Sequence, residues 1–555
     1  MKLKSKDKLI KNQKKYSRLK FKSRKINLIS FNLENLKDKY LNKLKLDRKN
    51  HLIGNWCRND QFIDGNLNNF LSLNFKKWKR NKNKANDIKK INFIYENLLC
   101  EFAKNLNIIH MTNYSQRYWE ILINKWLMAN ILDIYSKWKI SERIIKKYKI
   151  DNFYCLKINE NEFIPENTWH HNVLHKGSNG LWAHIIFKKI LKYKLKNFRE
   201  VTLNSKNVKL KKEKEKKHFK TYNIKSFLNF FLLKKIFLYD TSFDNNLKFF
   251  IFLKNFFINI CTKQKFVSLP LKSINLRSNF VKLFKTKNNN LENFIKKNIE
   301  ISFPKIFLEN YNSLENFYSR LNWPKNPHYI LTSYGHFYDE IFKIYCSKNI
   351  IKNTKLFLFQ HGESGIFKDV FDNIIGWDKI ADKFFVWGNN QKSNFEKFYF
   401  IKKFFFTKPK FKNINSGKIL LIMYGLHEQH DACRPLYGFP DRYKTNKGLI
   451  KNNIQFYKNL KIDIKKSINL KILDQTKNKL VFKKLNKIYS KSKIFDQKND
   501  YYKMMTTSNL VVHFYLGTPF FESMFFNKPS ILIFDPKFQL HLDKNFSYFV
   551  NKFYK

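Results

Sequence analysis

The stretch LVVHFYLGTPFFESMFFNKPSILIF, residues 510–534, decides the fold. Residues 510–514 are an apolar run of strand length, a Gly-Thr turn stands at 517–518, and residues 519–526 have helical character. An Asn-Lys-Pro stop precedes a second apolar run at 530–534. Strand, helix and strand in this order predict a parallel sheet of an α/β protein.

The same alternation occurs further upstream. A helix is expected at 339–346, and strands are expected at 329–332, 356–359 and 383–388. After these elements the pattern stops and then restarts with the apolar run at 418–425. The restart predicts two Rossmann-like α/β domains in series, which could face each other across a cleft.

The 555 residues divide into four expected parts. Residues 1–50 are basic and expected to be weakly ordered, with a first strand at 26–30. An N-terminal α/β domain is expected over 51–397, a linker over 398–416, and a nucleotide-binding α/β domain over 417–555. Amphipathic helices at 90–107 and 116–138 predict a helix-rich N-terminal elaboration, whereas residues 223–262 suit helix or strand equally.

The formal net charge of +65 raises the question of nucleic acid. Lys far outnumbers Arg, and Lys, Asn, Phe and Ile, the residues of AT-rich codons, are abundant along the whole chain. Codon bias therefore accounts for the charge, with an anionic membrane surface as an alternative. Nucleic acid is the least favoured partner because zinc-finger spacing, aromatic-glycine RNA motifs and basic-zipper patterns are absent.

The sequence also indicates a compartment. The Lys-rich N-terminus lacks the apolar core of a secretory signal, and no run approaches the roughly 18 apolar residues of a membrane span. Six scattered Cys residues without a C-x-x-C pair suit a reducing environment. A cytoplasmic protein is expected, with peripheral contact to the inner face of the membrane left open.

The most informative histidine is His361. It follows the predicted strand at 356–359, and a histidine at the carboxyl end of a strand is well placed for acid–base chemistry near neutral pH. Gly362 and Gly365 beside it would let the backbone approach a ligand closely. The alternative is a turn in which the imidazole only caps a neighbouring loop.

A phosphate site is predicted in the second domain. Thr518 stands where a helix begins, its hydroxyl can cap that helix, and free N–H groups there attract anions. Glu522 follows one turn later and could accept hydrogen bonds from ribose hydroxyls. Arg434 and Arg442 are the only Arg residues after residue 320 and suit phosphate recognition. An ordinary helix cap and chance clustering of the Arg residues are the alternatives.

A metal centre is not expected. Residues 427–430 read His-Glu-Gln-His, which is not H-E-x-x-H, and no third ligand is evident nearby. P-loop, G-x-G-x-x-G and G-x-S-x-G motifs are also missing, so no cofactor is expected.

Several short motifs, in this order over roughly residues 50–540, resemble the LIC-type transferases, bacterial proteins associated with surface-carbohydrate and lipopolysaccharide genes. They are Gly54-Asn55-Trp56-Cys57, residues 116–122 with Trp126-Leu127, Gln360-His361-Gly362, Val386-Trp387-Gly388, and residues 515–522 with 527–529. Three features depart from the family pattern: Asn55 replaces an acid, Glu363-Ser364 replaces a glycine-rich continuation, and the chain ends soon after Asp535-Pro536. The last departure leads us to expect that the final helices of the domain are missing.

The resemblance implies a fold like that of GT-B glycosyltransferases, with the donor nucleotide on the C-terminal domain. It also implies transfer of a sugar or related group to a surface-polysaccharide or lipid-linked acceptor, with His361 as the base. The alternative is a non-catalytic basic protein that binds nucleic acid or an anionic membrane. An even coat of Lys side chains would favour the enzyme, and a continuous basic stripe would favour the binding protein.

Overall fold

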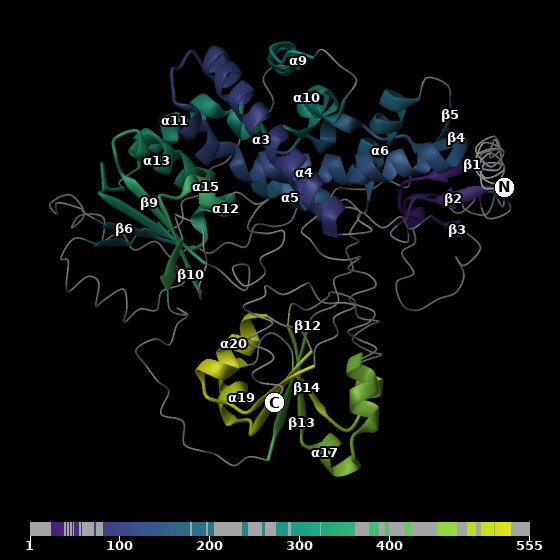
Figure 1. Ribbon diagram of the computed structural model, residues 1–555, viewed down its shortest axis with the longest axis vertical. Coiled ribbons are helices and arrows are strands. Elements are labelled where there is room, and N and C mark those ends of the chain that lie inside the picture. Colours follow the sequence, from purple (N-terminus) through teal and green to yellow (C-terminus); the bar gives the residue numbers. More distant parts are fainter. Residues whose placement is uncertain are drawn as a thin grey trace, which may run out of the picture.

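The computed structural model describes residues 24–37, 40, 44, 47, 49–54, 57, 71–73, 81–177, 180–195, 198–204, 236–241, 258–260, 274–286, 290–321, 323–360, 377–387, 395–398, 417–424, 452–473, 486–495, 501–514 and 517–533. Within them the chain is an α/β protein whose strands form three sheets (Figure 1). Every strand pairing in these sheets is parallel. We name the sheets A, C and D in chain order.

Sheet A is built by the N-terminal part of the chain. Its order is β3-β2-β1-β4-β5, and its strands are β1 (Arg24–Ile29), β2 (Asn50–Leu52), β3 (Leu71–Ser72), β4 (Tyr148–Leu156) and β5 (Arg199–Leu203). The central strand β1 buries Ile26, Leu28 and Ile29 completely. The strand expected at 26–30 is thus present as β1, whose apolar run lies between two parallel neighbours, whereas residues 1–23 lie outside the described residues.

Sheet C contains the strands predicted before residue 398. Its order is β11-β10-β9-β8-β6-β7, and its strands are β6 (Ile236–Tyr239), β7 (Ile258–Ile260), β8 (Tyr329–Thr332), β9 (Lys355–Phe359), β10 (Lys383–Trp387) and β11 (Phe395–Phe398). The ambiguous stretch 223–262 thus supplies two strands in its described part.

Long helices lie between sheets A and C (Figure 1). The helices of this part are α3 (Asn81–His110), α4 (Gln116–Lys147), α5 (Thr168–Gly177), α6 (Leu181–Lys194), α9 (Ile274–Lys282), α10 (Leu291–Ser302), α11 (Tyr311–Ser319), α12 (Gly335–Tyr338), α13 (Glu340–Ile350) and α15 (Trp377–Ile380). Helix α4 buries side chains around its whole circumference, including Trp119 and Trp126, as a helix inside a large core does. One continuous hydrophobic core includes residues of both sheets, from Ile26 to Val386.

Sheet D is formed by the C-terminal part. Its order is β14-β13-β12-β15-β16, and its strands are β12 (Ile419–Tyr424), β13 (Ile468–Leu473), β14 (Lys493–Phe495), β15 (Leu510–His513) and β16 (Ser530–Leu532). Its helices include α17 (Ile462–Lys466), α19 (Tyr501–Thr507) and α20 (Thr518–Phe525). Alternate residues of β12 enter separate cores on the two faces of the sheet, as expected when both faces are covered.

The strand orders have a functional consequence. Numbered along the chain within each sheet, sheets A and D have the order 3-2-1-4-5, and sheet C has the order 2-1-3-4-5-6. Both orders are those of doubly wound sheets, in which ligands bind at the carboxyl ends of the strands where the winding reverses. The reversals lie between β1 and β4, between β6 and β8, and between β12 and β15.

Candidate functional site

The reversal point of sheet C is shaped by the turn that follows β8. The hydroxyl of Thr332 accepts hydrogen bonds from the backbone N–H groups of Tyr334, at 3.3 Å, and Gly335, at 2.9 Å. The carbonyl of Asp240, directly after β6, accepts from the N–H groups of Ser333 and Tyr334 at 3.3 and 3.2 Å. The ends of the two strands on either side of the reversal are thereby joined by backbone hydrogen bonds.

A glycine is required at position 335, because the backbone there passes close to two aromatic rings. A Cβ atom at this position would lie 2.7 Å from the ring of Phe342 and 2.8 Å from the ring of Tyr239. Asp339 then begins α13: its Oδ1 accepts from the N–H of Phe342 at 3.0 Å, and its Oδ2 accepts from the hydroxyl of Tyr239 at 2.5 Å. The start of α13 is thus fixed against the end of β6.

A buried charged cluster lies on the first turn of α13. Lys343 is 1% exposed, and its ammonium donates to the carbonyl of Leu122 at 3.1 Å and to the hydroxyl of Thr168 at 3.1 Å. It also lies 3.4 Å from the carboxylate of Glu340, which accepts from the N–H of Thr168 at 3.0 Å. Burial lowers the pKa of Lys343, and the charge of Glu340 opposes that shift. The cluster ties α4, α5 and α13 together at one point.

Lys125 of α4 lies beside this cluster. Its Nζ is 5.0 Å from the centre of the Phe337 ring and 5.8 Å from that of Tyr338, within the range of a cation–π contact. Burial, followed by the charge of Lys343, lowers the pKa of Lys125 to about 7. Trp169, on the first turn of α5, meets the ring of Tyr338 edge-on at 5.0 Å and is 39% exposed. A lysine that titrates near neutral pH thus stands among aromatic rings at the carboxyl edge of a doubly wound sheet, a combination typical of functional sites.

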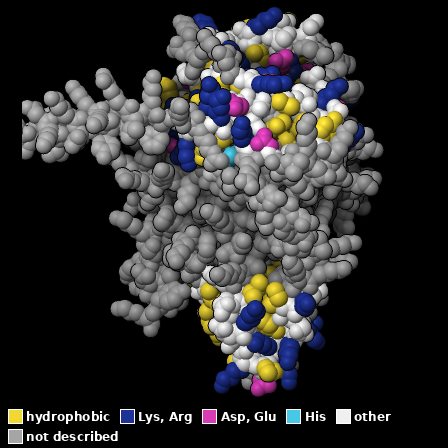
Figure 2. All heavy atoms as spheres, turned by 90° about the vertical axis from the view of Figure 1, so that its right-hand side faces the viewer, with side chains coloured by type: hydrophobic (Ala, Val, Ile, Leu, Met, Phe, Trp, Pro, Cys, Tyr) yellow, Lys and Arg dark blue, Asp and Glu magenta, His cyan; other side chains and the backbone are white. Residues whose placement is uncertain are grey.

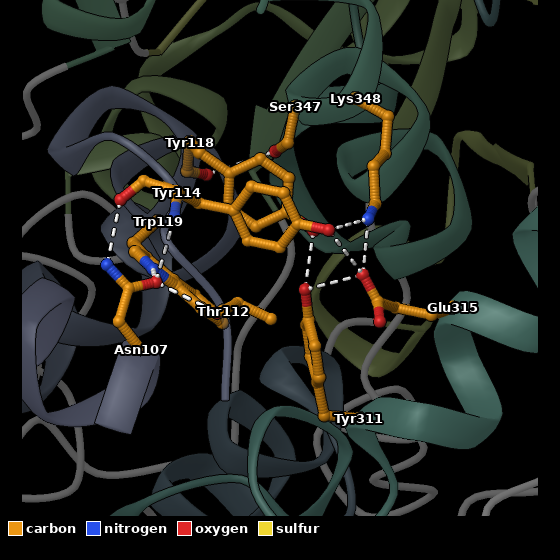
Figure 3. Close-up of polar contacts among 9 residues, drawn as sticks. All are labelled: Asn107, Thr112, Tyr114, Tyr118, Trp119, Tyr311, Glu315, Ser347 and Lys348. Atoms are coloured by element: carbon orange, nitrogen blue, oxygen red, sulfur yellow. Dashed lines mark hydrogen bonds and ion pairs between the residues drawn. The ribbon is translucent and has the colours of Figure 1, made fainter. Parts of the chain in front are cut away.

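A polar network fixes the helices that carry these residues (Figure 3). The hydroxyls of Tyr118 on α4 and Tyr311 on α11 lie 2.6 Å apart, and Tyr311 donates to Glu315 at 3.0 Å. Lys348 of α13 pairs with Glu315 and donates to the hydroxyl of Tyr114. Burial raises the pKa of both Tyr118 and Tyr311, so their hydroxyls stay protonated.

The same network includes residues of the motif at 116–122. The indole N–H of Trp119 donates to Asn107 of α3 at 2.9 Å, and Ser347 of α13 donates to the carbonyl of Tyr118 at 3.1 Å (Figure 3). Lys343 reaches the carbonyl of Leu122 one turn further along α4. These motif residues therefore hold α4 against α13 and position Lys125; they do not themselves form the site.

The reversal point of sheet A is filled by a histidine. Nδ1 of His184, on the first turn of α6, lies 2.7 Å from the hydroxyl of Ser30, directly after β1, and its Nε2 accepts from the N–H of Leu156 at the end of β4 at 3.2 Å. The imidazole is fully buried, and burial followed by the charge of Lys188 lowers its pKa to about 3. Since Nε2 accepts, the proton resides on Nδ1, and the neutral ring links the two strands.

Sheet D carries the described part of the predicted phosphate site. Helix α20 begins at Thr518 with Gly517 as its N-cap, so Thr518 occupies the first helical position, one residue after the cap. The carboxylate of Glu522 is buried and accepts from the hydroxyl of Tyr502 at 3.1 Å, which fixes α20 against α19. His513 lies 3.0 Å from the hydroxyl of Ser523, and burial lowers its pKa to about 3.

The other predicted site residues lie outside the described residues: His361, Gly362, Gly365, Arg434 and Arg442. The described chain reaches the carboxyl edge of sheet C at Gln360, whose buried backbone N–H donates to the carbonyl of Phe385 at 2.8 Å. His361 follows this residue directly. Lys125, Trp169, Glu340 and Lys343 were not predicted. Single Lys residues carry little information in so basic a chain, and Trp169 and Glu340 belong to none of the motifs described above.

Among the described residues, no helix has the length and apolar character that crossing a membrane requires. No group of three or more His, Cys, Asp and Glu side chains among these residues is arranged to hold a metal ion.

The comparisons with known proteins identify the family. No curated protein matches the chain. The model of the LIC12162 family transferases matches residues 37–551, a span that contains all of sheets C and D and four of the five strands of sheet A. With its parallel α/β sheets and this match over most of its length, the chain belongs to the LIC12162 family of transferases.

Proposed function

We propose that this transferase moves a sugar or related group from a nucleotide-activated donor to a glycan or lipid-linked acceptor of the surface-polysaccharide or lipopolysaccharide type. The observation that carries the proposal is the presence of two doubly wound parallel sheets, C and D, in a chain of a transferase family. Sheets of this kind bind nucleotides and related ligands where their winding reverses. In a GT-B-like pair of domains, each domain would bind one of the two substrates where the winding of its sheet reverses.

The donor is assigned to sheet D. The N-terminus of α20 is the positive end of its helix dipole and favours an anion there. Thr518, Arg434 and Arg442 would hold the diphosphate, and Glu522 would face the ribose on exchanging its hydrogen bond with Tyr502 for one with the ligand. At sheet C, His361 would remove the proton of the acceptor hydroxyl, with Gly362 and Gly365 allowing close approach.

The distribution of charge supports an enzyme over a protein that only binds a polyanion. On the face drawn in Figure 2, the described Lys and Arg side chains are scattered among apolar, acidic and other side chains. A surface that binds nucleic acid or a membrane by charge alone would gather them into one continuous patch.

The test is a thermal-shift panel of nucleoside diphosphates and nucleotide sugars on the full chain. We expect one nucleotide class to raise the melting temperature, and Thr518→Val to weaken its binding by about 1 kcal/mol, the value of one hydrogen bond. Thr506→Val is the matched control, because Thr506 lies at the end of α19, before β15 and therefore away from the carboxyl edge. Absence of any nucleotide-dependent shift, or equal effects of both variants, would contradict the donor site.

A further inference from the structure

Four partly exposed side chains form a patch at the reversal point of sheet C. They are Lys125, Trp169, Phe337 and Tyr338, which we call the Lys125 patch. Lys125 lies over the rings of Phe337 and Tyr338, and Trp169 packs edge-on against Tyr338. Because α12 begins at Gly335, directly after β8, the patch stands at the edge where doubly wound sheets bind ligands.

We propose that the Lys125 patch binds an acidic sugar, whose ring packs on the indole of Trp169 and whose anionic group pairs with the ammonium of Lys125. In the proposed function this ligand is the acceptor, so the inference rests on that function for its role. Binding itself does not depend on the donor site and can be measured separately.

The electrostatics of the patch favour an anionic ligand. Burial and the neighbouring charge of Lys343 both work against the protonated form of Lys125 and hold its pKa at about 7. A bound carboxylate or phosphate would reverse this effect, since an opposite charge within a few ångströms favours the ammonium form.

The aromatic rings favour a sugar as the carrier of that anion. Trp169 is 39% exposed, although a side chain of this size usually buries most of its surface. An exposed indole beside a cation suits the apolar face of a sugar ring that carries an acidic substituent. The buried cluster of Lys343, Glu340 and Thr168 holds α4 and α5 in place, so the lysine and the indole are positioned before a ligand arrives.

The experiment is a ligand-observed NMR titration of the full chain with three probes: glucuronate, glucose 6-phosphate and glucose. We expect at least one acidic probe to bind about tenfold or more tightly than glucose, because hydrogen bonds to charged groups contribute more than neutral ones. Comparison of the two acidic probes distinguishes a carboxylate from a phosphate. Equal binding of all three probes, or no binding of any, would overturn the proposal.

Variants then assign binding to the patch. Lys125→Gln should weaken the acidic probe about tenfold, Lys125→Arg should restore most of the affinity, and Trp169→Ala should weaken acidic and neutral probes alike. Lys352→Gln and Phe93→Ala are the matched controls, because both residues are exposed and lie elsewhere. Wild-type affinity in Lys125→Gln would overturn the assignment. If the full chain binds acidic sugars but no nucleotide, the proposed function is contradicted and the acidic-sugar site is not.

Discussion

In sheet A a buried histidine closes the reversal point, whereas in sheet C the corresponding place carries a glycine turn and a partly exposed lysine. His184 hydrogen-bonds the ends of β1 and β4 and has no exposed surface. At sheet C the ends of β6 and β8 are joined by the turn around Gly335, and Lys125 and Trp169 remain partly exposed beside it.

The comparison shows that the strand order of a doubly wound sheet determines where a ligand site can form. The side chains at that place determine whether one does form. The imidazole of His184 fills the reversal point and packs against two aromatic rings. Its ring centre lies 5.2 Å from that of Phe31 and 5.7 Å from that of Phe153. The core that contains this histidine's neighbours is continuous with the core beside sheet C, through the long helices between the two sheets.

The largest effect is expected from Lys343→Met. The substitution removes one partner of a buried ion pair and leaves the carboxylate of Glu340 buried with the N–H of Thr168, which should lower the free energy of unfolding by about 4 kcal/mol. All 10 Trp residues precede residue 388, so Trp fluorescence in urea reports on this core. Lys352→Met, at an exposed position after α13, is the control. A loss below about 1 kcal/mol would mean that the cluster does not fix the site.

His184→Ala should cost about 3 kcal/mol in the same assay. It leaves a cavity between sheet A and α6 and removes the acceptor for the N–H of Leu156. Binding to the Lys125 patch should be unchanged in the folded variant, because His184 belongs to the other sheet. His328→Ala, at an exposed position, controls for the loss of an imidazole. If His184→Ala instead abolished acidic-sugar binding at full stability, sheet A would have to be regarded as part of the site.

The sequence predicted the α/β class and six of the eleven strands of sheets C and D, because these six strands are apolar runs bounded by turn residues. The predicted strand at 329–332 is β8, and the predicted strand at 510–514 is β15 to within one residue. Sheet A as a whole was not predicted. Its strand β3 is two residues long, and β1 pairs with β4 across more than a hundred intervening residues, so local pattern could not reveal it.

The candidate site was predicted less well than the fold. The turn at Ser333 and Gly335 is visible in the sequence, but its partners on α4 and α5 are remote along the chain. Lys125 cannot be distinguished from many solvated Lys residues until α4 is packed against α12 and α13. Of the residues predicted for the donor, only Thr518 and Glu522 are described, and Glu522 has a packing role that the sequence did not indicate.

Tyr311→Phe is expected to have a smaller effect, about 1.5 kcal/mol. The phenol hydroxyl joins Tyr118 and Glu315, and its loss leaves both with one partner fewer (Figure 3). Because the network only holds α4, α11 and α13 together, affinity for the acidic sugar should stay within about twofold of wild type. Tyr329→Phe, at a position 40% exposed, is the control. A large loss of affinity at full stability would place the network within the site.

The smallest effect is the pH dependence that Lys125 gives to stability. Its pKa is about 7 in the folded chain and near the ordinary value of 10.5 when unfolded, so between these values the unfolded chain binds more protons. The free energy of unfolding should therefore rise with pH above 7, and the rise attributable to Lys125 should be about 1 kcal/mol between pH 7 and pH 8. Lys343 and Tyr338 lie near Lys125, and Glu340 and Asp339 act on Lys343; all four groups are common to wild type and Lys125→Gln. Urea unfolding of both proteins at several pH values isolates the contribution of Lys125 as their difference. A difference that does not grow with pH would show that Lys125 keeps an ordinary pKa, and the reversal point of sheet C would then lack the electrostatic property that distinguishes it from that of sheet A.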